Sequence, residues 1–403
     1  MEALDHPERG LRGALVAGTN GKGSVIEMVR SVLQAAGVRV GTMPKPHLVS
    51  YRERIAVDGV ALSEQRFADA VAAVLPAVDE VAMRLGPPTE FEALTAAAIR
   101  ELAQQRVDLA VVEVGMGGRL DATNVLDLGV AVVTNVQHDH ERYLGSTLAA
   151  IGGEKAAIVK RGDAAVTGAS GRGLRPISER CAALRVPLRR AGPAQPYAAT
   201  LLSSGWAGIV IDATTPERRL DGLSIGLLGG HQATNAAVAL ATLEALAVDL
   251  DEATIRAGMA QARWPGRLEL IESGRFGRVL LDGAHNPAGA AALARALLEL
   301  EVKRPVLVFG AMRGKRVSAV LRALAPLRPR PIFTSVADPH AHRPAELLGR
   351  WRRIARGGEV MPEPAAAMDR AAGLRRVPED PIVVAGSLYL VGAVRGMLLG
   401  DAP

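Results

Sequence analysis

Short apolar runs alternate along this chain with longer stretches in which apolar residues recur at helical spacing. The runs at 13–17, 107–114 and 128–136 suit buried parallel strands, and each leads directly into polar residues. Before residue 266, helical spacing is found at 24–37, 62–85, 91–105, 147–160 and 231–246. This alternation predicts an α/β fold built on a mainly parallel sheet.

The alternation weakens between residues 165 and 225 and restarts after Trp264. In 165–225 short strand-like pieces are separated by Gly and Pro, whereas beyond 266 apolar runs again precede helical patterns. We therefore predict two domains, a larger α/β domain over 1–265 and a smaller, Rossmann-like α/β domain over 266–403.

The composition is that of a globular protein without a disulfide framework. Of the 403 residues, 49% are hydrophobic and one, Cys181, is a cysteine. We interpret Cys181 as a buried or incidental thiol, because no histidine or catalytic motif stands near it. No apolar run approaches the ~20 residues that a membrane helix needs, and the charged start MEALDHPERGLRG lacks the apolar core of a signal peptide. We expect a cytoplasmic protein that is not bound to a membrane.

The net charge of +6 raises the question of nucleic-acid binding. The arginines are dispersed along the chain, and aromatic residues, which would stack on bases, make up 3% of it. We therefore expect no nucleic-acid partner and interpret the charge as a solvated surface that attracts small anionic substrates.

A glycine-rich turn with one lysine follows the first apolar run. Backbone N–H groups of such a turn point at one anion, and the helix that follows adds its positive N-terminal end. Lys22 can reach β- and γ-phosphates, and the Ser24 hydroxyl can take a metal ion. Because Val16 replaces the first glycine of a standard P-loop and Gly23 separates Lys22 from Ser24, an ordinary strand–helix turn remains the alternative. The predicted nucleotide contacts in this turn are Thr19, Asn20, Gly21, Lys22, Gly23 and Ser24.

The segment AGTNGKGS (17–24) resembles the phosphate loop of the folylpolyglutamate synthase/dihydrofolate synthase branch of the Mur ligase superfamily. Nine further blocks resemble that family in the same order: PHLVSYRERIAVDG, FEALTAAAIREL, VEVGMGGRLDATNV, HDHERYLGSTLAAIGGEKAAIVKRG, GGHQATNAAVA, WPGRLE, DGAHNPAG, VFGAM and AGSLYLVGAVR. The resemblance implies a P-loop, Mur-ligase-like ATP-binding domain over 1–265 and a ligase domain over 266–403. It implies ATP and one or two Mg²⁺ ions as cofactors. The implied reaction joins glutamate to a folate- or pteroate-type carboxylate through an acyl phosphate.

The resemblance also implies roles for individual residues. The implied nucleotide contacts outside the turn are Asn235, Arg267 and Asp282. The implied metal ligands are Ser24, Glu113, His140 and Lys155, the last as a carbamate, and the implied catalytic residues are Lys22, His140, Lys155 and His285. The implied acid-substrate contacts are Arg54, Phe91, Arg119 and Asp121. By residue type alone, Glu113 could pair with a helix cap, His140 could lie on the surface and Lys155 could be an ordinary helix lysine. His138 and Asp139 are weaker metal candidates.

Three features depart from the family's pattern. Lys45 stands where a serine usually precedes PHL, and we hypothesise that it takes over part of the work of one metal ion. Only a dozen residues precede GALVAG, and MRGKR (312–316) replaces an acidic pattern. A paralogous ligase that couples an amino acid to a different small acid therefore stays open, as does a paralogue that only binds nucleotide. We expect a monomer whose partners are a small-molecule acid and glutamate.

Overall fold

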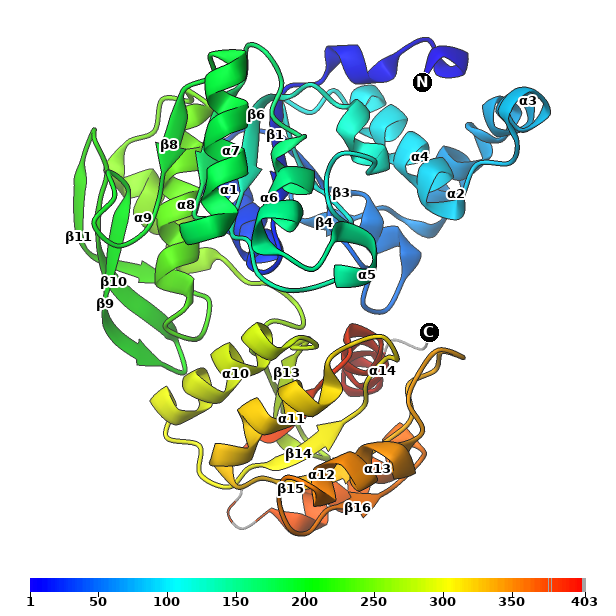
Figure 1. Cartoon of the computed structure of the whole chain (residues 1–403), viewed down its shortest axis with the longest axis vertical. Helices are drawn as coiled ribbons and strands as arrows, with labels where there is room; N and C mark the ends of the chain where they lie inside the picture. Colours follow the sequence, from blue (N-terminus) through cyan, green and yellow to red (C-terminus); the bar gives the residue numbers. More distant parts are fainter. Residues whose placement is uncertain (376, 378, 401–403) are drawn as a thin grey trace.

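The computed structural model describes residues 1–375, 377 and 379–400, which form two α/β lobes (Figure 1). The first lobe is built on an eight-stranded sheet. The neighbouring strands β2, β5, β1, β6, β7 and β8 pair in parallel, and an antiparallel β3–β4 hairpin pairs with β2 at one edge. Across the sheet the strands are β4 (Val60–Ala61), β3 (Ala56–Val57), β2 (Val40–Met43), β5 (Leu109–Glu113), β1 (Gly13–Ala17), β6 (Gly129–Val133), β7 (Ala164–Thr167) and β8 (Leu188–Arg190). The predicted mainly parallel α/β sheet is confirmed.

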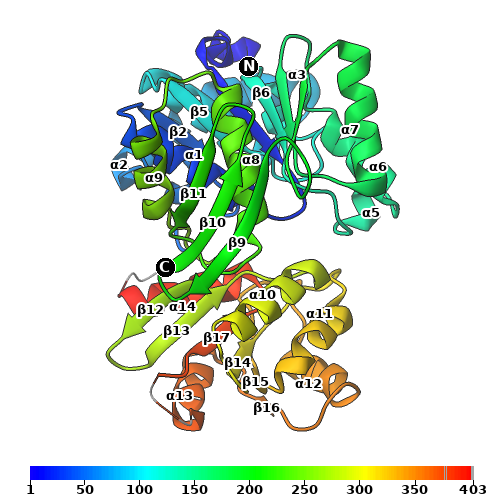
Figure 2. The same cartoon turned by 90° about the vertical axis from the view of Figure 1, so that its left-hand side faces the viewer.

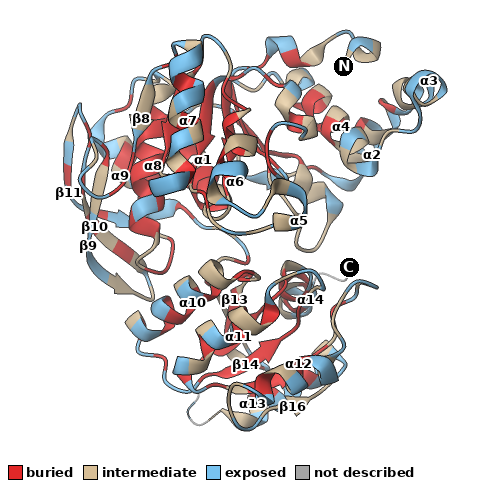
Figure 3. Cartoon of the chain, viewed as in Figure 1, coloured by how far each residue is buried: buried red, intermediate tan, exposed pale blue. Residues whose placement is uncertain are grey.

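Helices cover both faces of this sheet, which explains why β1 is buried along its whole length (Figure 3). Ala14 and Val16 of β1 pack in one core with α1 (Lys22–Ala35), α8 (Gln232–Ala245) and α9 (Glu252–Gln261). Leu15 and Ala17 pack in a second core with the helices of the opposite face, α4 (Glu90–Gln104), α6 (Leu148–Ala156) and α7 (Gly171–Leu184). The other helices of this lobe are α2 (Glu64–Ala72), α3 (Leu75–Leu85) and α5 (Glu141–Leu144).

A separate antiparallel sheet lies outside α8 and α9 (Figure 2). Its strands are β9 (Ala198–Gly205), β10 (Gly208–Thr214) and β11 (Arg219–Ile225). Ile209, Ile211 and Leu223 share the core of α1 and α8, so this sheet adds a layer to the first lobe.

The description of 165–225 as short strand-like pieces is wrong for α7, a 14-residue helix that contains Pro176. Glycine and proline lower helix propensity, and burial of Ile177 and Cys181 against the sheet outweighs that preference. Cys181 is buried, in line with the interpretation of a buried or incidental thiol, and burial raises the pKa of this thiol to about 11.

The second lobe is a six-stranded sheet with helices on both faces. In order the strands are β12 (Glu269–Ser273), β13 (Gly277–Asp282), β17 (Ile382–Ala385), β14 (Val306–Phe309), β15 (Arg330–Phe333) and β16 (Glu359–Val360), with only the β12–β13 pair antiparallel. The helices on one face are α10 (Pro287–Glu299), α11 (Val317–Leu324) and α12 (Pro344–Arg352), and those on the other are α13 (Pro364–Leu374) and α14 (Leu388–Leu399). None of the helices within the described residues combines the length and apolar character needed to cross a membrane.

Candidate active site

The carboxyl ends of three neighbouring strands converge where open α/β sheets bind ligands. β1 pairs in parallel with both β5 and β6, so the glycine turn after β1, Glu113 at the end of β5 and the segment after β6 meet at one edge. A cavity of about 580 Å³ opens there and is lined by both lobes. The predicted site residues that line it are Thr19, Asn20, Gly21, Lys22, Gly23, Ser24, Arg54, Phe91, Glu113, His140, Lys155, Asn235, Arg267, Asp282 and His285.

Two glycines let the phosphate turn pass close to its neighbours. At Gly18 (φ +153°) an added Cβ would lie 1.9 Å from Thr134 Oγ1, and at Gly21 (φ +80°) it would lie 2.4 Å from Asn235 Oδ1. Any side chain at either position would collide with these groups. α1 begins at Lys22, directly after Gly21, so the turn opens a helix as predicted.

The segment after β6 fixes the shape of the turn. Thr134 Oγ1 and Asn135 Nδ2 both donate to Asn20 O, and Asn20 N–H donates to Asn135 Oδ1. The Asn20 amide also donates to Gln137, while Thr19 Oγ1 donates to the Gln137 carbonyl. The side chains of Thr19 and Asn20 therefore hold the turn in place, a role that the sequence analysis did not assign. The polar run TNVQHDH directly after β6 was the signal for these missed partners.

Two lysines and one carboxylate meet at the turn. Lys22 Nζ and Lys155 Nζ both donate to Gly18 O, at 3.2 and 3.1 Å, and Glu113 Oε1 lies 3.7 Å from Lys22 Nζ. Lys155 is buried on α6, so it is not an ordinary exposed helix lysine. Burial, with a smaller contribution from the charge of Lys22, lowers the pKa of Lys155 to about 7. The predicted juxtaposition of Lys22 and Glu113 is present, and it lies in one cavity with His140.

His140 follows β6 with a left-handed backbone (φ 50°) at the start of α5. Its Nε2 lies 3.2 Å from Lys315 Nζ. Burial, followed by the charge of Lys315, lowers the pKa of His140 to about 4. The imidazole is therefore neutral near pH 7, and its Nε2 lone pair accepts a hydrogen bond from the Lys315 ammonium, which has no lone pair of its own.

The second lobe closes the cavity with Arg267, Asp282 and His285. Asp282 ends β13, and its two carboxylate oxygens accept the N–H groups of Leu268 and Ala284 at 2.9 Å each. Burial raises the pKa of Asp282. Each oxygen still has a lone pair for a hydroxyl donor.

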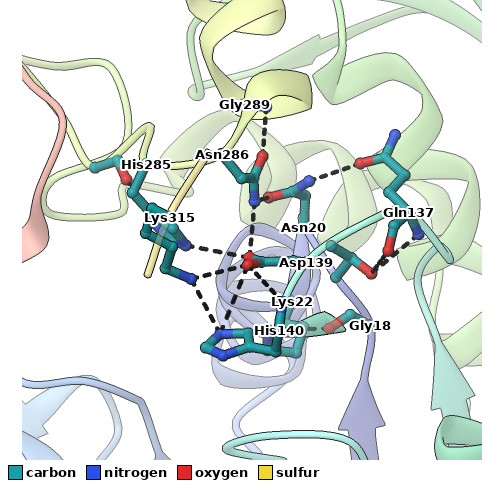
Figure 4. A network of polar contacts seen from close by, with 12 residues as sticks. Gly18, Asn20, Lys22, Gln137, Asp139, His140, His285, Asn286, Gly289 and Lys315 are labelled. Carbon is teal, nitrogen blue, oxygen red and sulfur yellow. Dashed lines mark hydrogen bonds and ion pairs between the residues drawn. The ribbon is translucent and has the colours of Figure 1, made fainter. Parts of the chain in front are cut away.

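Asp139 links the two lobes (Figure 4). Its Oδ1 accepts from Lys315 Nζ at 2.8 Å, and its Oδ2 accepts from Asn286 Nδ2 at 3.1 Å and lies 3.4 Å from His285 Nε2. Asn286 also donates to Asn20 Oδ1 of the phosphate turn. The sequence considered Asp139 only as a weaker metal candidate and did not predict this link, because its partners Lys315 and Asn286 come from segments far away in the sequence.

The acid-substrate candidates divide into two groups. Arg54 and Phe91 line the cavity, and Arg54 Nε donates to His47 Nδ1 at 2.9 Å. Arg119 and Asp121 are absent from the lining: Arg119 is exposed and pairs with Glu154. Asp121 caps the 3₁₀ helix Ala122–Val125. The structure thus places only the first pair against the cavity, and a direct contact of Arg119 or Asp121 with substrate has no support in this arrangement.

Within the part of the chain that the structure describes, no cluster of three or more His, Cys, Asp or Glu side chains could hold a metal ion. Mg²⁺, however, is typically held by one or two carboxylates together with substrate phosphates. The Glu113 carboxylate and the Ser24 hydroxyl fit that donor set.

We predict that Asp139→Asn destabilises the protein near neutral pH and that the effect fades in acid. Burial alone would raise the pKa of Asp139, but the contact with His285 and the charge of Lys315 hold it well below its usual range. The carboxylate therefore contributes stability above the unfolded-state pKa of about 3.9, and this contribution falls as the pH drops toward the folded-state pKa. Urea titrations should show a loss of about 1–3 kcal/mol at pH 7 and a smaller loss at pH 3.5.

The matched control is Asp369→Asn, which removes an exposed ion pair with Arg275. It should change the free energy of unfolding by less than about 1 kcal/mol at either pH. An equal loss for Asp139→Asn at both pH values would contradict the assigned role of its charge.

Comparison with known proteins extends what the geometry indicates. Residues 16–243 match the Mur ligase middle domain, and residues 266–388 match the Mur ligase glutamate ligase domain. The chain is 32% identical to the dihydrofolate synthase/folylpolyglutamate synthase of Bacillus subtilis, covering 99% of this chain and 93% of that protein. It is 36% identical to the Mycobacterium tuberculosis protein of the same name, covering 100% and 84%.

Solved structures give the same assignment. The folylpolyglutamate synthase of M. tuberculosis complexed with ADP and AMPPCP superposes with a TM-score of 0.92 at 33% identity, covering 99% of this chain and 93% of that one. Escherichia coli FolC in complex with DHPP and ADP has a TM-score of 0.86 at 30% identity, covering 99% and 92%. The chain therefore belongs to the folylpolyglutamate synthase/dihydrofolate synthase family of Mur ligases, which are ATP-dependent ligases that add glutamate to folate or dihydropteroate.

Proposed function

We propose that the cavity between the lobes binds ATP, activates the carboxylate of a folate or dihydropteroate as an acyl phosphate, and transfers that acyl group to the amine of glutamate. The observation that carries this proposal is the convergence of Lys22, Lys155 and Glu113 on the phosphate turn. The nucleotide complexes of the M. tuberculosis relative and the DHPP complex of E. coli FolC support it.

The phosphate end of the nucleotide is assigned to the turn and to the start of α1. The N–H groups of Gly21 to Ser24 and the Lys22 ammonium supply donors and positive charge for the β- and γ-phosphates. Ser24 and Glu113 are assigned as ligands of Mg²⁺, which when bound would neutralise charge on the phosphoryl group during transfer.

The nucleoside end is assigned to the second lobe together with α8 of the first lobe. Asp282 suits ribose hydroxyls because both of its oxygens are acceptors, and Arg267 suits a phosphate because its guanidinium is planar and always charged. Asn235, which packs against Gly21, and His285 complete this set. The division into an ATP-binding domain (1–265) and a ligase domain (266–403) stays a proposal, supported by the membership of β1–β11 and β12–β17 in separate sheets.

The reaction then follows from the positions of these groups. A carboxylate oxygen of the acid attacks the γ-phosphorus, the bond from that phosphorus to the β–γ bridging oxygen breaks, and ADP leaves. The amine of glutamate next attacks the acyl carbon, the carbon–oxygen bond to phosphate breaks, and the amine loses a proton as the amide forms. Lys22 stabilises the charge that develops on the phosphoryl oxygens in the first step. Contacts between the lobes at Asp139 keep the acyl phosphate from water.

We predict that ADP release requires ATP, Mg²⁺, glutamate and a folate or dihydropteroate together, and that the acid gains the mass of one glutamyl residue. Replacement of the phosphate lysine, Lys22→Met, should lower kcat about 10²–10³-fold because a preorganised donor to the transferred group is lost. A coupled ADP assay and mass spectrometry of the product measure both effects.

The control for this variant is Lys303→Met, at an exposed position of the second lobe, which should keep full activity. ADP release that is the same with and without the acid would mean hydrolysis rather than ligation and would contradict the proposed function.

We also predict that Lys155 takes up CO₂. A neutral amine reacts with CO₂ to form a carbamate and release a proton, and the low pKa of Lys155 provides the neutral form near pH 7. The carbamate would supply the carboxylate-like ligand for a second Mg²⁺. In ¹³C-bicarbonate at pH 8, the protein should show a carbamate ¹³C signal that is lost in Lys155→Met and retained in Lys303→Met. Identical spectra for the wild type and Lys155→Met would rule out the modification.

A further inference from the structure

Lys45 carries a buried ammonium group that no hydrogen bond satisfies. Its side chain is 8% exposed, and among the described residues no acceptor lies within hydrogen-bond distance of Nζ. An ammonium group has three N–H donors, and a buried donor without an acceptor is unfavourable. Lys45 lines the cavity, so a ligand in that cavity can supply the acceptor that the protein does not.

The nearest groups balance the charge of Lys45 without bonding to it. The ring centroid of Phe91 lies 3.9 Å from Nζ, which is a cation–π contact, and Asp121 Oδ1 also lies 3.9 Å away. The oxygens of Asp121 already accept from Met116 N, Thr123 N and Thr123 Oγ1. Burial lowers the pKa of Lys45 to about 8, with Asp121 and Glu113 opposing the shift, so the ammonium is mostly charged at pH 7.

The position of Lys45 connects the two ends of the cavity. Its backbone N–H donates to Glu113 Oε2 at 2.9 Å, and the other oxygen of Glu113 lies 3.7 Å from Lys22 Nζ. Its side chain contacts Phe91, which lines the same cavity as Arg54. Lys45 therefore contacts both the carboxylate beside the phosphate lysine and a side chain predicted to contact the acid.

We propose that Lys45 Nζ binds the reacting carboxylate of the acid substrate and holds one of its oxygens against the γ-phosphorus. The ammonium donates to the carboxylate before the attack and to the acyl phosphate after it. It stays protonated throughout, because the step forms a carbon–oxygen–phosphorus bridge and releases ADP without a proton transfer. The proposal rests on the ligase function above and adds a substrate-binding residue to it.

The sequence suggested that Lys45 takes over part of the work of one metal ion. Binding of the reacting carboxylate gives that hypothesis a specific form, because the ammonium supplies positive charge and N–H donors but no lone pair. The contact of Lys45 with Phe91 places the ammonium beside an aromatic surface, which suits the body of an organic acid. Glutamate also carries an α-carboxylate, which an ammonium group could bind in the same way. The experiment must therefore measure the two substrates separately.

The test compares wild type with Lys45→Met, which keeps the length of the side chain and removes its charge and donors. With AMPPCP bound, calorimetry should show an affinity for the folate or dihydropteroate that is about 10- to 100-fold lower, as expected for the loss of a charged hydrogen bond. The affinity for AMPPCP and the KM for glutamate should change less than about twofold. Lys45→Arg, which keeps the charge, should recover part of the affinity for the acid, and Lys303→Met should match the wild type.

Thermal stability separates binding from a structural role. Lys45→Met removes buried donors that make no hydrogen bond, and Asp121 keeps the three hydrogen bonds that it accepts, so the melting temperature should stay close to that of the wild type. A lower melting temperature would indicate a structural role and overturn the proposal. A change confined to the KM for glutamate would also overturn the proposal. A raised requirement for Mg²⁺ with unchanged affinity for the acid would do the same. If the wild type itself turns over neither acid, the ligase function fails; if it is active and Lys45→Met binds acid normally, only the role of Lys45 fails.

Discussion

The ammonium groups of Lys22 and Lys155 donate to a single backbone oxygen, that of Gly18, with the Glu113 carboxylate beside them. The two lysine side chains and the carboxylate therefore lie together at the N-terminal end of α1, where the helix dipole adds further positive charge. Such a site attracts an anionic ligand, and the Glu113 carboxylate leaves it able to hold a cation that accompanies that ligand. The lowered pKa of Lys155 is a second consequence, because an amine beside another cation in a buried position loses its proton more easily.

The position of this cluster depends on the order of strands in the first sheet. β1 lies between β5 and β6, so the turn, Glu113 and the segment after β6 meet although nearly a hundred residues separate the first from the second. The second lobe then reaches the same edge through Asn286 and Lys315, whose side chains bond to Asp139. Closure of the lobes and assembly of the site are therefore linked, because Asn286 contacts both Asp139 and the phosphate turn.

The sequence was sufficient to predict the family and the α/β fold, and most of the site residues predicted from it line the cavity. The continuous apolar run of β1, which is buried at every position, and the glycine turn before α1 are local signals, and ten blocks in order made the family clear. The sequence was insufficient where a role depends on a distant partner. The importance of Asp139 arises from Lys315 and Asn286, which lie in another lobe, and the capping role of Asp121 depends on how residues 116–125 fold. Local patterns also failed for α7, where tertiary burial outweighs the effect of glycine and proline.

In the proposed reaction, the cavity brings a carboxylate oxygen onto the γ-phosphorus of ATP before the amine attacks. An acid substrate labelled with ¹⁸O in its reacting carboxylate, turned over with ATP and glutamate, tests this directly by mass analysis of the released phosphate. We expect one ¹⁸O atom in each phosphate released, because the bridging oxygen of the acyl phosphate leaves with phosphorus. Unlabelled phosphate accompanying formation of the glutamyl product would contradict it.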